Sequence, residues 1–116
     1  MKFKLIVVMI DEMQTETVLE TAREAGATGS TVITSARGEG LKPPKTFFGL
    51  DLVSQRDMVF LLVEEHLSRT ILEHISEACG FDETPGTGIA FQLDIEDAVG
   101  LASQMGVISS EIEDQI

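Results

Sequence analysis

The chain has 116 residues, which is enough for one domain with a single hydrophobic core. Hydrophobic residues make up 43% of it, as in packed globular proteins and unlike disordered ones. The net charge of −12 at pH 7 argues against nucleic acid and anionic membranes as partners, because most of the surface would repel them. One cysteine, Cys79, leaves no internal disulfide framework and is consistent with a cytoplasmic location.

The first third of the chain is predicted to be a strand, a helix and a second strand. Residues 2–10 are apolar, β-branched and nearly continuous, as in a central strand, and the run is too short to insert into a membrane. Asp11 is a candidate N-cap for a helix that ends near Ala25, and Gly26 suits the position after it, where a positive φ is favoured. The buried stripe of this helix is Val18, Leu19, Ala22 and Ala25. Residues 30–36 form the second strand.

A long loop, residues 38–55, separates the second strand from a third at residues 57–64. Loops of this length are uncommon in compact domains and are often functional. A second helix is expected from Leu67 to Cys79, with Gly80 ending it and Cys79 acting as a small buried hydrophobe. Its buried stripe is Leu67, Ile71, Ile75 and Ala78.

The last elements are a turn-rich segment at residues 81–88, a strand at 89–95 and a short helical turn through Val99 and Leu101, followed by an acidic tail at 102–116. The element order β-α-β-β-α-β predicts one ferredoxin-like α+β domain over residues 1–116, with an antiparallel sheet and both helices on one face. The other face would then need a cover, for which homo-oligomerisation is the usual solution.

Three segments together resemble the PII nitrogen-regulatory signalling proteins over residues 3–101. They are Gly26-Ala27-Thr28-Gly29-Ser30-Thr31-Val32 after the first helix, Gly38-Glu39-Gly40 at the loop, and Pro85-Gly86-Thr87-Gly88-Ile89-Ala90-Phe91 followed by Asp94-Ile95-Glu96-Asp97-Ala98-Val99. The resemblance implies a cytoplasmic homotrimer that takes part in signal transduction as an enzyme regulator. In that family an adenine nucleotide binds between subunits, and the long loop docks on a transporter or an enzyme.

By position, the resemblance places six residues in the nucleotide cleft. Glycines let backbone N–H groups approach a phosphate closely and can form an anion-binding nest, although the same glycines could serve turn geometry alone. One wall would be Thr28, Gly38 and Gly40, and the other Gly86, Thr87 and Gly88.

The chain departs from the family pattern at three phosphate-facing cations. Ile89 stands where the family has Lys, and Gly100 and Ala102 stand where it has two Arg. Each charge-assisted hydrogen bond contributes roughly 1.5–3 kcal/mol, so weaker binding of a nucleoside triphosphate is expected. The candidate replacement cations are Arg37, Lys42, Lys45 and Arg56.

The long loop also has the composition of a docking segment. Lys42 and Lys45 flank the apolar Phe47 and Phe48, and an apolar tip beside charge is typical of a protein contact. Alternatively, the two phenylalanines could fold back onto their own trimer. The loop has no Tyr, so the family's tyrosine modification cannot occur there.

Other chemistry has less support in the sequence. His66 and His74 lie eight residues apart, too far along one helix to share a metal ion within a subunit. No nucleophile–base motif is present, so a non-enzymatic regulator with no catalytic and no metal-binding residues is predicted. The alternatives are a CutA-type metal-binding trimer, which has the same fold, a ligand-independent adaptor, and a small enzyme on this fold.

Overall fold

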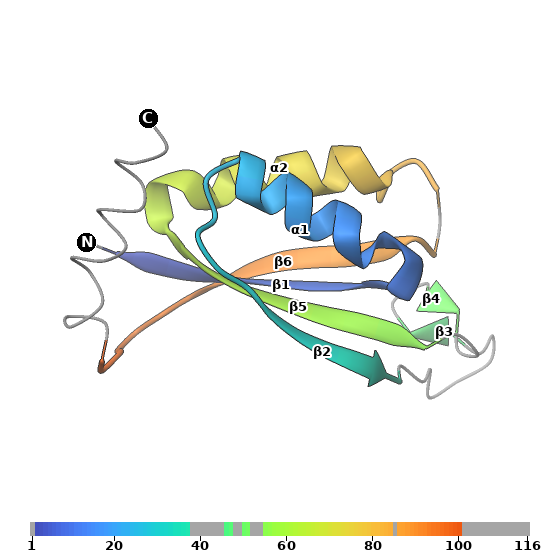
Figure 1. The fold of residues 1–116 in the computed structure, drawn as a ribbon, viewed down its shortest axis with the longest axis horizontal. Helices are drawn as coiled ribbons and strands as arrows, with labels where there is room; N and C mark the ends of the chain where they lie inside the picture. Colours follow the sequence, from blue (N-terminus) through green and yellow to red (C-terminus); the bar gives the residue numbers. More distant parts are fainter. Residues whose placement is uncertain (1, 38–45, 48–49, 52–54, 85, 101–116) are drawn as a thin grey trace.

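The computed structural model describes residues 2–37, 46–47, 50–51, 55–84 and 86–100. Two helices lie across one face of a sheet, as Figure 1 shows. The helical elements are a 3-10 helix at Glu12–Gln14, α1 at Thr15–Glu24 and α2 at Glu65–Cys79. The strands are β1 Phe3–Asp11, β2 Thr31–Ala36, β3 Thr46–Phe47, β4 Leu50–Asp51, β5 Arg56–Glu64 and β6 Gly88–Asp94.

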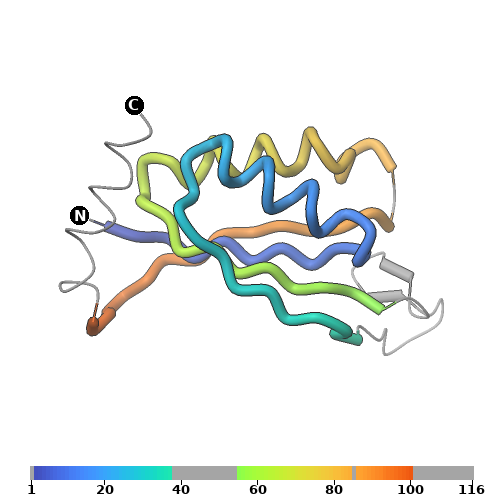
Figure 2. The backbone as a smooth tube through the Cα atoms, in the orientation of Figure 1, coloured from blue at the N-terminus to red at the C-terminus, as the bar shows by residue number. Residues whose placement is uncertain are grey.

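The main sheet has the order β2-β5-β1-β6, and each neighbouring pair is antiparallel. Figure 2 shows the two helices running along the same side of this sheet. This arrangement confirms the predicted ferredoxin-like fold. β2 and β6 are the two outer strands, so each has one edge that pairs with no other described strand.

The core lies between the sheet and the helices. Alternate residues of β1 and β5 face the helices, because side chains of a strand point to opposite faces in turn. Val18 and Ala22 of α1 and Ile71 and Ile75 of α2 complete it. The sheet contributes Ile6, Val8, Ile10, Val59, Leu61 and Val63, all at most 3% exposed.

Polar capping and glycines set the ends of the helices, as predicted. The Asp11 carboxylate accepts a hydrogen bond from the Met13 amide at 2.9 Å and so caps the 3-10 turn that precedes α1. Gly26 and Gly80 follow the two α-helices with φ of 114° and 66°, where a side chain would be strained.

Three sequence predictions were wrong in detail. The long loop contains a short two-stranded ladder, β3–β4, that had not been predicted. Ala78 is exposed, because the buried row of α2 steps by four residues from Ile75 to Cys79, which is 5% exposed as expected. Residues 95–100, which include Val99, form no helix, and residues 96–100 are exposed, so no packing would stabilise an isolated turn; Leu101 lies outside the described residues.

The face of the sheet away from the helices is apolar. Its residues are the alternate set on each strand, including Val7, Met9, Met58, Phe60 and Ile89. Four large side chains on it are well exposed in the single chain: Ile33 at 49%, Leu62 at 39%, Phe91 at 36% and Leu93 at 48%. An apolar surface of this extent is typical of a protein–protein interface.

Candidate functional site

The two glycine-rich segments approach the same end of the sheet. Gly88 lies opposite Ile10, and Ile10 lies opposite Asp57. Arg56, one residue earlier on β5, lies opposite both Asp11 and Ala36. Adjacent strands lie about 4.8 Å apart, so β2 and β6 are separated by roughly 14 Å at this end. The turn at Gly86 and the start of the long loop therefore share an end but lie at opposite edges.

The turn before β6 is held by its own contacts. Gly86 has a φ of 81°, and the Thr87 hydroxyl donates to the Thr84 carbonyl at 2.9 Å and lies 3.4 Å from the Gly80 carbonyl. A Cβ on Gly88 would lie 2.5 Å from Cε1 of Phe81. Packing thus explains Gly88 and turn geometry explains Gly86, and a ligand role for the three residues stays a prediction.

Ile89 belongs to the apolar face. It pairs with Met9 of β1 and is half-buried on the side of the sheet away from the helices. At the position where the resemblance predicts a Lys, Ile89 therefore adds to the helix-free surface.

The base of the long loop contains a strained residue. The register of β2 shifts between Ile33 and Ala36, which makes a β-bulge. Two residues of β2, Thr34 and Ser35, there lie opposite one residue of β5, Asp57. Ser35 has a φ of 59°, a conformation that costs a non-glycine residue about 1–2 kcal/mol. The sequence gives no signal for this bulge, since a Ser in a β-branched run is typical of an ordinary strand.

Arg56 and Asp57 are the buried charged residues at this end, at 5% and 6% exposure. As neighbours on a strand they point to opposite faces. Asp57 faces the helices and accepts a hydrogen bond from the Thr15 hydroxyl at 2.6 Å. Arg56 faces the other side, and its Nε has no hydrogen-bond partner among the described residues.

Thr28 lies elsewhere in the single chain. It is exposed, and with Gly26 and Ala27 it lines a small cavity beside Leu62 and Val63. Leu62 is five residues along β5 from Asp57, roughly 17 Å at the usual rise per residue. Within one subunit Thr28 does not meet the Gly86–Gly88 turn.

The remaining predicted residues cannot be placed. Gly38, Gly40, Lys42, Lys45 and Phe48 lie outside the described residues. Phe47 is in β3, but only its backbone is described.

Other chemical groups are isolated in the described part of the chain. His66 Nε2 lies 3.3 Å from Glu64 Oε2, and no three His, Cys, Asp or Glu residues among those described are grouped to hold a metal ion. Burial raises the pKa of the Cys79 thiol, so it stays protonated and unreactive at neutral pH. Among the described residues, no helix has the length and apolar character needed to span a membrane.

Comparison with family models gives a match to "Nitrogen regulatory protein P-II" over residues 3–104. The chain belongs to the nitrogen regulatory protein P-II family. The predicted resemblance is therefore confirmed. Among curated proteins, no sequence matches the chain.

Solved structures of PII-like proteins share the fold of this P-II family member. One is CPII from Thiomonas intermedia K12 bound to ADP, AMP and acetate, with 21% identity, a TM-score of 0.66 and coverage of 86% of this chain and 92% of that one. A PII-like signalling protein from Thermus thermophilus has 22% identity, a TM-score of 0.61 and coverage of 81% and 87%. CPII bound to ADP, AMP and bicarbonate has 20% identity, a TM-score of 0.63 and coverage of 84% and 94%.

Proposed function

We propose that this P-II family protein is a non-enzymatic regulator that binds an adenine nucleotide near Arg56 and alters a partner through the long loop. The observation that carries the proposal is the buried Arg56 guanidinium, whose Nε lacks a partner among the described residues. An unsatisfied buried donor costs about 1–3 kcal/mol. A bound anion would remove this cost, and Arg is well suited to phosphate and carboxylate.

The neighbourhood of Arg56 fits a phosphate-bearing ligand. Gly86, Thr87 and Gly88 lie at the same end of the sheet, two strands away, which is about 10 Å between backbones. The positive φ at Gly86 is compatible with a turn that presents backbone amides to an anion. The titles of the similar CPII structures name ADP and AMP together with acetate or bicarbonate, so both nucleotide and small-anion binding occur on this fold.

The site requires a second copy of the chain. The exposed apolar residues of the helix-free face, such as Phe91 and Leu93, would be covered if copies assemble through it, and the family resemblance favours a trimer. Thr28 lies too far from Gly86 to contribute within one subunit, so it would complete the cleft from a neighbouring subunit. Gly38 and Gly40 would come from the base of the loop.

Regulation would act through the loop that leaves Ala36. We infer that ligand binding shifts the population of loop conformations, which requires a ligand with different affinities for the two states. Lys42 and Lys45 with Phe47 and Phe48 would contact the partner, a transporter or an enzyme. Capture of a partner that survives deletion of residues 41–55 would contradict this role.

Calorimetric titration with AMP, cyclic AMP, ADP and ATP tests the binding proposal. Loss of one charge-assisted hydrogen bond in Arg56→Met is expected to weaken nucleotide binding by about tenfold to a hundredfold. Arg69→Met is the matched control, because Arg69 is 72% exposed on α2 and its loss should leave affinity unchanged. ATP is expected to bind more weakly than AMP or ADP in the absence of the family's three cations.

Two results would overturn the proposal. The first is the absence of binding heat with all four nucleotides, which would favour a ligand-independent adaptor. The second is a monomer in sedimentation equilibrium, where a trimer would show three times the chain mass of 12.6 kDa.

A further inference from the structure

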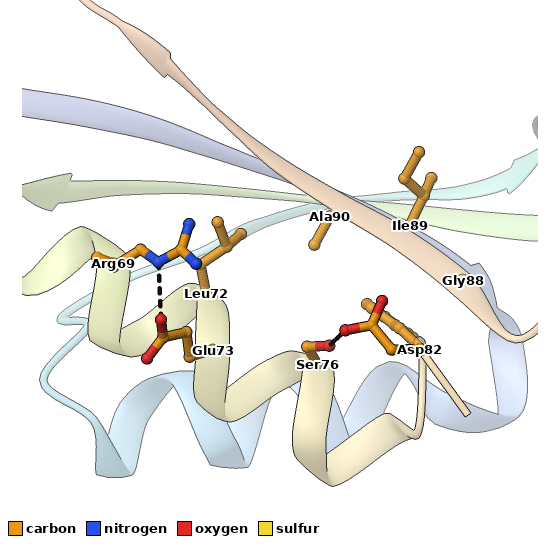
Figure 3. Close-up of a pocket in the computed structure, with 9 residues that line it drawn as sticks. Arg69, Leu72, Glu73, Ser76, Asp82, Gly88, Ile89 and Ala90 are labelled. Carbon is orange, nitrogen blue, oxygen red and sulfur yellow. Dashed lines mark hydrogen bonds and ion pairs between the residues drawn. The ribbon is translucent and has the colours of Figure 1, made fainter. Parts of the chain in front are cut away.

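The two edge strands of the sheet differ in regularity. β6 pairs with β1 without a register shift, so its side chains alternate between the two faces of the sheet. Figure 3 shows this alternation, with the Ala90 side chain directed toward α2 and the Ile89 side chain directed away from it. β2, the other edge strand, lies beside β5 in Figure 1 and contains the bulge at Thr34 and Ser35. The extra residue of a bulge reverses the face on which every following residue of that strand lies.

The bulge places Ala36 on the helix-free face of the sheet. Ala36 lies opposite Arg56, and residues opposite each other in an antiparallel pair point to the same face. Arg56 points away from the helices, because its neighbour Asp57 faces them. Continued by one residue, the same alternation directs Arg37 to the helix side. In the observed register Arg37 and Arg56 therefore lie on opposite faces.

A regular register of β2 would bring the two arginines to one face. Without the extra residue, Ser35 would lie opposite Arg56, while the pairing of Thr31, Val32 and Ile33 with β5 would stay as it is. Arg37 would then lie on the helix-free face, diagonally across from Arg56. Diagonal neighbours on one face are about 7–8 Å apart, which is within reach of long side chains. Both guanidinium groups could therefore contact the same anion.

The residues that would exchange faces are small and lie outside the core. Ser35 is exposed and Ala36 is half-buried, so little packing is lost when either one changes face. Asp57 would keep its hydrogen bond from Thr15, because neither of these residues belongs to β2. The change of register is therefore confined to the end of β2 that leads into the long loop.

Two opposing effects balance the two registers. Ser35 has a φ of 59°, which is unfavourable for a serine, so backbone strain favours loss of the bulge. The regular register would bring two guanidinium groups to one face, and their repulsion favours the bulge. A bound anion removes this repulsion and accepts hydrogen bonds from both groups. An anion therefore has a higher affinity for the regular register, which is the condition for a population shift.

We propose that the bulge at Thr34 and Ser35 is a register switch that sets the face on which Arg37 lies, and that the regular register adds Arg37 to the anion site at Arg56. The coupling of this switch to a ligand rests on the proposed function, in which Arg56 binds the nucleotide. The switch adds a second cation to that site and a defined structural change at the start of the long loop.

Substitutions at position 35 test the switch without a ligand. Ser35→Gly is expected to keep the bulge, because glycine adopts a positive φ without strain, whereas Ser35→Val should favour the regular register, because a β-branched residue is strongly disfavoured at positive φ. Backbone nuclear Overhauser contacts of Arg56 measure the register: a contact with Ala36 indicates the bulge, and a contact with residue 35 indicates the regular pairing. Thr31→Gly and Thr31→Val are the matched controls, because Thr31 is exposed in the regularly paired part of β2. A bulge that persists in Ser35→Val would overturn the proposal.

Calorimetric titration with ADP tests the role of Arg37. Ser35→Val is expected to bind ADP about tenfold more tightly than Ser35→Gly, while the two Thr31 variants should differ less than about twofold. Arg37→Met should weaken ADP binding by about tenfold when it is combined with Ser35→Val, and by less than about twofold when it is combined with Ser35→Gly. Equal effects of Arg37→Met in the two backgrounds would show that the register does not control this arginine.

The unsubstituted protein separates failure of the switch from failure of the nucleotide site. Saturating ADP should replace the contact between Arg56 and Ala36 by one between Arg56 and Ser35. If ADP binds and the contact with Ala36 persists, the switch is wrong and the nucleotide site stands. If neither the unsubstituted protein nor the Ser35 variants bind ADP, the proposed function fails, and a regular register in ligand-free Ser35→Val still supports the switch.

Discussion

The hydrogen bond between Thr15 and Asp57 joins the start of α1 to the start of β5. The Thr15 hydroxyl donates to Asp57 Oδ2 at 2.6 Å, and both residues are at most 7% exposed. Thr15→Val keeps the side-chain shape but removes the donor, leaving a buried carboxyl oxygen against a methyl group. Hydrogen bonds to charged groups contribute about 1.5–3 kcal/mol, so a loss of about 2 kcal/mol in the free energy of unfolding is expected.

Urea unfolding at a fixed protein concentration measures this loss, because an oligomer's stability depends on its concentration. Thr70→Val is the control: Thr70 is exposed on α2, and its replacement should change stability by less than about 0.5 kcal/mol. A double-mutant cycle that combines Thr15→Val with Asp57→Asn should give a coupling energy above about 0.5 kcal/mol. If Thr15→Val is as stable as Thr70→Val, the buried hydrogen bond does not stabilise the fold and the reasoning is refuted.

Three further predictions concern packing and pH. Gly88→Ala should destabilise the fold by about 1–3 kcal/mol in urea unfolding, because the new Cβ would lie 2.5 Å from Phe81; an unchanged midpoint would contradict this packing. The pKa of Asp94 is lowered by its hydrogen bond from Lys4, so this pair should stabilise the fold above pH 3.8 and lose its effect as pH falls below that value. Asp94→Asn should reduce the loss of unfolding free energy at acid pH. If the variant loses as much stability at acid pH as the original protein, the pair does not stabilise the fold. Burial raises the pKa of Cys79 above its usual 9.0, so stability should fall as pH rises past that value, and Cys79→Ala should remove this decline; a decline that persists in the variant would have another source.

The elements of this protein could be predicted because their signals are local. The apolar run at residues 2–10 and the stripe through Val18 and Ala22 each have the period of one kind of element. Gly26 and Gly80 end the helices because each adopts a positive φ. The β3–β4 ladder was not predicted because strands of two residues are too short to show a period.

The candidate site could be predicted only in part. The Gly86–Gly88 turn was recognisable as a motif, but the sequence could not show that Gly88 packs against Phe81. Arg56 was one of four candidate cations, and only the pairing of β5 with β1 and β2 shows that it is buried between them. Thr28 was assigned to the same cleft, and only the sheet register shows that a single subunit keeps it far from Gly86.

The order of strands and helices, and with it the ferredoxin-like fold and the P-II family, was determined by the sequence itself. Periodicity and helix-ending glycines act within a few residues, so they can be read without knowing what lies across the sheet. The tertiary structure alone decided which groups meet. Neighbours on a strand face opposite sides, so Arg56 was directed away from the helices and Asp57 toward Thr15 by strand pairing over long sequence separations.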